Sequence, residues 1–184
     1  MTQEENIARR CQEGDRQAQR LLYETYAQWL LGVCLRYTGD HDTAQDLLQD
    51  GFVQILTQID KFKWRGEGSL KAWVYRVQQN VILMYLRKNE QYRSTLSLDE
   101  NLETVENIPE PESVNDIPHR TLMEMITSLP PGYRTIFNLY VIDGHSHKEI
   151  AQMLGIGEKT SASQLVHARR ILANKINEWR NQNL

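Results

Sequence analysis

IDGHSHKEIAQMLGIGEKTSASQLVHARRIL, residues 142–172, predicts two helices joined by a tight turn. Ser146 and Glu149 have the spacing of a capping box, which predicts the start of the first helix. Residues 155–157 predict its end, because glycine adopts the positive φ that terminates helices. A second helix is expected from about Glu158. Two helices joined by a short glycine turn form a helix-turn-helix, which places its second helix in the major groove of duplex DNA.

Charge is distributed unevenly along the 184 residues, whose formal net charge is −3. Residues 94–118 hold seven acidic and no basic side chains, whereas residues 61–93 hold eight basic and two acidic side chains. Local patches attract DNA more than total charge does, so the net charge does not exclude a nucleic-acid binder. Residues 94–118 also contain three prolines and lack a helical period, which predicts a flexible linker.

The periodicity on both sides of the linker is helical, which predicts an all-α chain of two small helical domains. We expect the domains at residues 1–93 and 119–184, with the linker at 94–118. Thr2, Asp15 and Ser69 are expected to cap helices in the first domain. Its predicted inward-facing side chains include Leu22, Trp29, Leu47, Leu48, Phe52, Leu70, Trp73, Val77, Val81 and Met84.

Several functional classes lack support in the sequence. Cys11 and Cys34 match neither a disulfide framework nor a zinc spacing, and we interpret them as reduced packing residues. His145 and His147 flank Ser146 without a third ligand, so no metal site is expected. The sequence shows no catalytic constellation and implies no cofactor. With a polar N-terminus and no apolar run of membrane-spanning length, we expect a cytoplasmic chain without membrane insertion.

Three stretches resemble the extracytoplasmic-function sigma factors, a group of bacterial RNA polymerase sigma subunits in the sigma-70 family. AQDLLQDGFVQIL at 44–56 looks like the helix that binds core polymerase. GSLKAWVYRVQQNVILMYLRK at 68–88 looks like the promoter-melting helix. LPPGYRTIFNLYVIDGHSHKEIAQMLGIG at 129–157, followed by TSASQLVHARRIL at 160–172, looks like region 4. Their order and spacing extend the resemblance over nearly the whole chain.

The resemblance implies a function in transcription initiation. Region 2, expected in residues 1–93, would bind the β′ clamp helices of core RNA polymerase and melt the minus-10 promoter element. Region 4, expected in residues 119–184, would bind the minus-35 element and the β flap. The polymerase carries out the chemistry, so the chain itself is not expected to be an enzyme. An anti-sigma factor, which commonly holds such proteins inactive, is an expected partner.

A candidate polymerase-binding face lies on the helix predicted over residues 42–59. Asp46 and Asp50 stand one turn apart, with Gln49 beside them. A solvated acidic face is one interpretation of this pattern. The resemblance implies the other, because Asp46, Gln49 and Asp50 match positions that contact β′, where carboxylates can pair with basic groups of the partner.

A candidate minus-10 surface lies in residues 61–88, which combine basic and aromatic side chains. Basic groups bind phosphates, and aromatic faces stack on unpaired bases for roughly 1–3 kcal/mol each. The expected contacts are Lys63, Trp64, Lys71, Trp73, Arg76 and Asn80.

The resemblance adds detail to this surface. Trp73, Arg76 and Asn80 match positions near the start of melting, and Asn80 can bond a base edge with its amide. Residues 63–70 match the loop that forms the pocket for a flipped base. A core position remains the alternative for Trp73, because it lies in helical register with Val77.

The second helix of the helix-turn-helix is the expected minus-35 reader. The candidate contacts are Lys159, Ser161, Ala162, Ser163, Gln164, His167, Arg169 and Arg170. Gln164 can bond an adenine edge, and Arg169 or Arg170 can bind phosphate, although a solvated helix end is the alternative for both arginines. Family members often carry basic residues where this chain has Ala162, Gln164 and His167, so the bases recognised stay open.

Two other functions are compatible with parts of the sequence. A stand-alone helix-turn-helix regulator would bind duplex DNA without polymerase, and residues 44–56 and 68–88 would then have no explanation. A helical enzyme or protein-interaction bundle would require a pocket with perturbed titratable groups, which the sequence does not suggest. Run-off transcription with core polymerase distinguishes the three.

Overall fold

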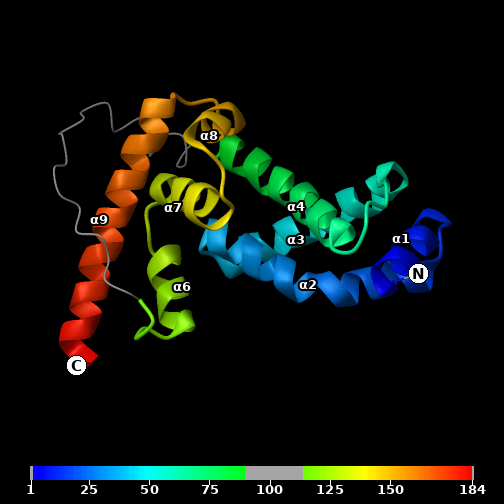
Figure 1. Ribbon diagram of the computed structural model, residues 1–184, viewed down its shortest axis with the longest axis horizontal. Helices are drawn as coiled ribbons and strands as arrows, with labels where there is room; N and C mark the ends of the chain where they lie inside the picture. Colours follow the sequence, from blue (N-terminus) through cyan, green and yellow to red (C-terminus); the bar gives the residue numbers. More distant parts are fainter. Residues whose placement is uncertain (1, 90–113, 184) are drawn as a thin grey trace. The chain divides into compact units, whose positions relative to one another are not determined.

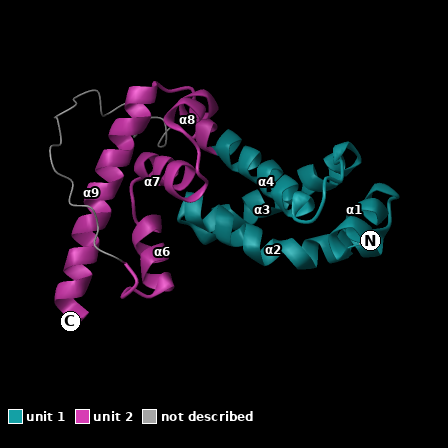
Figure 2. Ribbon diagram, viewed as in Figure 1, with its two compact units in different colours: residues 1–85 teal, residues 86–184 magenta. Residues whose placement is uncertain are grey.

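The structure, a computed structural model, describes residues 2–89 and 114–183, and every regular element in these two ranges is a helix (Figure 1). The chain divides into two compact units, residues 1–85 and 86–184 (Figure 2). The predicted all-α architecture with two helical domains is therefore confirmed. Residues 94–113 of the predicted linker lie outside the described residues. Among the helices that are described, none is long and apolar enough to cross a membrane.

The first unit contains α1 (Gln3–Gln12), α2 (Arg16–Thr38), α3 (His41–Gln58), the short 3-10 helix η1 (Ile59–Lys61) and α4 (Ser69–Lys88). Local capping sets several of these boundaries. The Thr2 hydroxyl accepts a hydrogen bond from the Glu5 amide at the start of α1, and Gly39 ends α2 in the left-handed conformation, at φ 68°. Ser69 departs from its expected capping role, because it is the first residue of α4 and its hydroxyl accepts from the Arg65 amide in the preceding loop.

The core of the first unit is built mainly from aliphatic side chains of α2, α3 and α4, including Leu22, Leu30, Ile55, Leu70 and Ile82. Two residues expected to face inward do not. Trp29 is 37% exposed and Met84 is 53% exposed. The buried side of α4 changes along the helix, from Leu70 and Val77 in its first half to Leu83 in its second, and this rotation leaves Met84 in solvent.

Gly51 of α3 makes room for a buried polar side chain of α4. Gln78 is fully buried, and its Nε2 donates a 2.8 Å hydrogen bond to the Leu47 carbonyl. A Cβ atom at position 51 would lie 1.8 Å from Gln78 Oε1 and 2.7 Å from its Nε2. Because the amide is enclosed and hydrogen-bonded, it cannot swing into solvent to relieve this overlap.

Replacing Gly51 with alanine is therefore expected to destabilise the first unit by about 1–3 kcal/mol, the usual cost of overpacking, despite the better helix propensity of alanine. Adding Gln78→Ala removes the overlapping amide, so the double variant should be more stable than the sum of the single variants predicts. Urea unfolding followed by circular dichroism measures the three free energies. If the change in the free energy of unfolding of the double variant equals the sum of the two single changes, the proposed overlap is contradicted.

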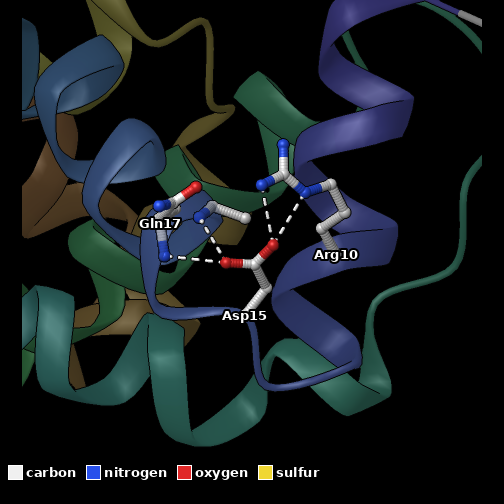
Figure 3. Close-up of polar contacts among 4 residues, drawn as sticks. Arg10, Asp15 and Gln17 are labelled. Carbon is white, nitrogen blue, oxygen red and sulfur yellow. Dashed lines mark hydrogen bonds and ion pairs between the residues drawn. The ribbon is translucent and has the colours of Figure 1, made fainter.

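Asp15 links the start of α2 to the end of α1 through hydrogen bonds and an ion pair (Figure 3). Its carboxylate accepts hydrogen bonds from the Gln17 amide at 2.8 Å and the Ala18 amide at 3.3 Å, and Arg10 pairs with it at 2.7 Å. The Arg10 guanidinium, followed by the Gln17 amide, holds the pKa of Asp15 below its ordinary value of 3.8. The charged form of Asp15 thus joins the two helices.

This pKa shift has a definite sign for stability. A carboxyl whose pKa is lower in the folded state stabilises the fold above its unfolded pKa, and loses that contribution as the pH falls through the folded value. Asp15→Asn keeps an N-cap but removes the charge, so it should lower the melting temperature at pH 7. The difference from wild type should shrink as the pH falls below 3.8. A difference that stays constant across this acid range would contradict the assignment.

The second unit contains α6 (His119–Thr127), α7 (Pro131–Phe137), the π-helical turn η2 (Asn138–Ile142), α8 (His147–Leu154) and α9 (Glu158–Asn183). Its main core is formed by Ile117, Met125, Leu129, Ala168, Leu172 and Ile176. Ile117 belongs to the stretch predicted as linker, and its neighbour Asp116 pairs with Arg180 of α9 at 2.9 Å. The last residues before α6 therefore pack onto this unit.

A buried arginine fixes the corner between α6 and α7. The Arg134 guanidinium donates hydrogen bonds to the carbonyls of Thr127 and Leu129, at the C-terminal end of α6. Burial lowers the pKa of Arg134 from its ordinary value. A cation is favourable there, because the last carbonyls of a helix have no partner within the helix and carry partial negative charge.

Candidate nucleic-acid and partner-binding interfaces

A pocket of about 270 Å³ opens where the loop after η1 meets the first turns of α4. Its lining residues are Lys61, Phe62, Lys63, Arg65, Ser69, Ala72, Trp73 and Arg76. Four of these side chains are cationic and none is a carboxylate, so the pocket attracts anionic groups such as phosphates. The rings of Phe62 and Trp73 lie 5.4 Å apart and supply an aromatic wall.

The structure brings together part of the predicted minus-10 set at this pocket. Lys63, Trp73 and Arg76 line it. Asn80 is exposed on α4 one turn beyond Arg76, on the same side of the helix, and Trp64 is half-buried in the loop. Trp73 combines the two predicted interpretations, because it is half-buried against Phe62 and also lines the pocket.

Lys71 does not join this group. Its ammonium lies 4.9 Å from the centre of the Trp29 ring on α2, in a cation–π arrangement. Trp29 in turn stacks on Tyr75 of α4, with 5.6 Å between ring centres. Lys71 and Trp73 are two residues apart on a helix, so they point to different sides, and Lys71 belongs to the side that faces α1 and α2.

Some pocket residues were not among the predicted contacts. Lys61, Phe62 and Arg65 share the basic and aromatic character of the loop, and that composition was the signal that could have identified them. Ser69 and Ala72 carry no such signal, because their place in the lining depends on where the loop folds against α4.

The candidate polymerase-binding face is exposed on α3. Asp46, Gln49 and Asp50 all point to solvent, and none of the three side chains has a hydrogen bond or ion pair with the part of the chain that the structure describes. The opposite side of α3 is held in the core by Leu47 and Phe52, among others. The exposed face is therefore rigidly presented by a helix whose other side is fixed.

Val53 extends this face and was missed by the sequence analysis. It is 61% exposed and follows Gln49 and Asp50 by four and three residues, which places all three on one side of α3. Val53 thus adds an exposed apolar side chain to the face that carries Gln49 and Asp50. The signal was present in the sequence, because Val53 lies outside the register of the core positions.

The helix-turn-helix has the predicted geometry. Ser146 and Glu149 form a complete capping box at the start of α8, and Gly155 ends this helix in the left-handed conformation at φ 69°. His147 stacks on Tyr140 with 4.4 Å between ring centres, and its Nδ1 lies 2.9 Å from the Ser161 hydroxyl on α9. Burial, followed by the positive charge of Arg169, lowers the pKa of His147, which keeps the imidazole neutral at pH 7.

The predicted minus-35 residues fall into three groups by exposure. The exposed residues are Lys159, Arg169 and Arg170. The half-buried residues are Ala162 and His167, and the buried residues are Ser161, Ser163 and Gln164. Ser161 has a clear structural partner in His147, so in this conformation its hydroxyl joins α8 to α9 and does not face solvent. His167 stacks on Tyr133, with 5.5 Å between ring centres.

Comparison with known proteins identifies the family of both units. Residues 22–92 match the family model "Sigma-70 region 2", and residues 119–172 match "Sigma-70, region 4". The ECF RNA polymerase sigma-E factor of Haemophilus influenzae is 29% identical, covering 92% of this chain and 93% of its own length. The protein of the same name from Escherichia coli K12 is 27% identical, covering 92% of each chain.

Solved structures give a more distant match. The chain of CnrH in complex with the cytosolic domain of CnrY is 21% identical with a TM-score of 0.46, covering 94% of this chain and 96% of that one. The two family models together span more than half of the sequence, in the order that the resemblance predicted. This protein therefore belongs to the extracytoplasmic-function group of the sigma-70 family, the non-catalytic subunits with which RNA polymerase initiates transcription.

Proposed function

We propose that this sigma factor guides core RNA polymerase through three surfaces. The face of Asp46, Gln49, Asp50 and Val53 binds the β′ clamp helices, the α4 pocket captures a base of the minus-10 element, and α9 contacts the minus-35 element. The observation that carries the proposal is the pocket itself. It combines four cations with two aromatic rings beside a helix that matches region 2, and this is the composition that unpaired nucleic acid requires.

The pocket suits strand opening for energetic reasons. Extruding a base from duplex DNA costs a few kcal/mol in lost stacking and pairing. Stacking of the base on an aromatic side chain returns about 1–3 kcal/mol. Lys63 and Arg76 can hold the flanking phosphates while Trp73 offers its ring. Binding of the opened strand thus offsets the cost of opening, which is the contribution expected of a subunit that melts DNA without catalysing a reaction.

The minus-35 contacts proposed for α9 divide into phosphate and base contacts. Lys159, Arg169 and Arg170 are exposed cations suited to phosphates. Ala162 and His167 are half-buried candidates for base edges, and Ser163 and Gln164 stay predictions for contacts that require them to become accessible. Region 4 is also proposed to bind the β flap, on the basis of family membership.

Arg169→Ala should weaken promoter binding by a similar factor on every sequence. Because one phosphate contact is lost, the slope of log affinity against log salt should become shallower by about 1. Binding of holoenzyme to a labelled promoter duplex at several salt concentrations measures this slope. A change in which base is preferred, with an unchanged salt slope, would assign Arg169 to base recognition.

We expect an anti-sigma factor as a regulatory partner, and this expectation rests on the family. Such a partner would copurify with the tagged chain from its native host and compete with core polymerase for it. The copurified chain and core polymerase should therefore exclude each other from the tagged chain in a binding assay. A copurified chain that binds at the same time as core polymerase would not be an anti-sigma factor of this kind.

Transcription by reconstituted holoenzyme tests the proposal as a whole. Core polymerase with this chain should start transcripts at a defined set of genomic sites, whose upstream sequences share two short motifs with constant spacing. Core polymerase alone should start at none of them. Tight and specific duplex binding by the isolated chain without any transcript would instead support a stand-alone helix-turn-helix regulator.

A further inference from the structure

The N-terminal helix α1 holds the loop of the α4 pocket at both ends. Residues 62–68 connect η1 to α4. At the start of this loop, Gln12 Nε2 donates hydrogen bonds to the carbonyls of Ile59 at 3.0 Å and Phe62 at 2.9 Å. At its end, the Glu4 carboxylate accepts a 2.8 Å hydrogen bond from the Gly68 amide. Two side chains of one helix therefore restrain both anchor points of the loop.

Both restraints act on atoms that shape the pocket. Gly68 has a φ of 79°, and its carbonyl accepts the 2.9 Å hydrogen bond from the Ala72 amide that begins α4. Holding the Gly68 amide thus fixes where α4 starts, and with it Ala72 and Trp73 in the lining. Holding the Phe62 carbonyl fixes the residue whose ring packs against Trp73.

Glu4 is itself firmly placed. Its second carboxylate oxygen accepts a 2.8 Å hydrogen bond from the Tyr26 hydroxyl of α2. Burial, followed by this hydrogen bond, raises the pKa of Tyr26, so the phenol remains a donor at all ordinary pH values. The pair of Arg10 with Asp15 then joins the other end of α1 to α2. The loop is consequently positioned relative to a frame of two packed helices.

We propose that α1 is a positioning element for base selection, with Glu4 and Gln12 as its positioning residues. This inference rests on the proposed function of the pocket. Helix α1 lies outside residues 22–92, the segment that matches region 2. A binding site discriminates between similar groups only when its lining is held to within about 0.5 Å, and loops reach that precision through supporting hydrogen bonds. Loss of the hydrogen bonds from Glu4 or from Gln12 to the loop should therefore reduce selectivity for the captured base, while the α3 face stays unchanged.

Two substitutions remove these hydrogen bonds, of which Glu4→Gln keeps the size of the side chain and Gln12→Ala shortens it. Glu4→Gln leaves one oxygen where the carboxylate has two, so either Tyr26 or Gly68 must face an amide NH₂ group. Gln12→Ala removes both hydrogen bonds at the start of the loop. The matched controls are Glu5→Gln and Gln17→Ala, whose native side chains form no hydrogen bond with the described part of the chain.

The experiment uses holoenzyme assembled from core polymerase and the full chain. Each holoenzyme selects from a library of fork-junction DNA whose unpaired minus-10 positions are randomised, and the bound DNA is sequenced. Wild type and both controls should enrich one base at one unpaired position. Glu4→Gln should lower this enrichment by about fivefold, the effect of one hydrogen bond, and Gln12→Ala, which removes two, by at least about as much, both with unchanged affinity for core polymerase.

The outcomes separate the two proposals. If wild type enriches no base, the proposed function of the pocket is wrong, and the inference about α1 is overturned with it. If wild type enriches a base and Glu4→Gln and Gln12→Ala enrich it as strongly as wild type, the proposed function of the pocket is supported and the inference about α1 is overturned. A loss of core binding in both variants would also overturn the inference about α1, because the hydrogen bonds of Glu4 and Gln12 would then support the fold in general. Reduced enrichment in either variant with intact core binding supports the inference.

Discussion

Asp50→Arg is expected to abolish assembly with core RNA polymerase while region 2 stays folded. Asp50 is exposed on α3 and makes no hydrogen bond or ion pair with the described residues, so its reversal disturbs no internal contact. At the interface it replaces an attraction with a repulsion beside Asp46 and Gln49. Breaking charge pairs within an interface costs about 2–5 kcal/mol, which corresponds to a loss of affinity of about thirty-fold or more. A binding titration of the labelled chain with core polymerase measures this loss of affinity.

The control for this prediction is Glu178→Arg, the same reversal at an exposed position on α9. It should leave core binding and the melting temperature nearly unchanged, since isolated surface charges contribute little to stability. Wild-type affinity of the Asp50→Arg variant for core polymerase would contradict the assignment of the α3 face. Equal losses in both variants would show that the effect is one of total charge.

Trp73→Ala is expected to reduce open-complex formation by about ten- to a hundred-fold, because the strand that leaves the duplex loses its stacking partner. The side chain is half-buried against Phe62 and lines the pocket, so its removal acts on both the aromatic wall and the base. The rate of open-complex formation by reconstituted holoenzyme is the relevant measurement. Binding of the same holoenzyme to a fully paired minus-35 duplex should be unaffected.

Two further variants distinguish stacking from loss of structure. Trp73→Tyr keeps a ring and should retain most of the activity, whereas Lys88→Ala removes an exposed cation from the far end of α4 and should have a small effect. If Trp73→Tyr is as defective as Trp73→Ala at an unchanged melting temperature, a specific contact of the indole would be required. A Trp73→Ala protein that opens promoters at the wild-type rate would exclude the pocket from melting.

Helix boundaries were predictable because they depend on neighbouring residues. The capping box of Ser146 and Glu149 and the left-handed Gly155 act within a few residues, and the structure contains both as predicted. The acidic face of α3 was predictable for the same reason, because the helical period of its own residues places Asp46, Gln49 and Asp50 on one side. The inward face of α4 was predicted only in part, because a single helical period cannot show that the buried side rotates and leaves Met84 exposed.

The pocket was less predictable because its shape depends on contacts between distant parts of the chain. Glu4 meets Gly68 across 64 residues, and Gln12 meets Ile59 across 47 residues. Composition indicated a basic and aromatic loop, but not that Lys71 would be drawn to Trp29 on another helix. The bond between Ser161 and His147 likewise could not be inferred from spacing, since it joins two helices across the turn.

The central claim is that this chain enables RNA polymerase to open promoter DNA, and permanganate footprinting tests it directly. The reagent modifies unpaired thymines, so core polymerase with the wild-type chain should expose thymines between the minus-10 element and the transcription start. Neither component alone should expose them, and the Trp73→Ala holoenzyme should expose far fewer. A holoenzyme that assembles and binds the promoter but leaves every thymine paired would contradict the account.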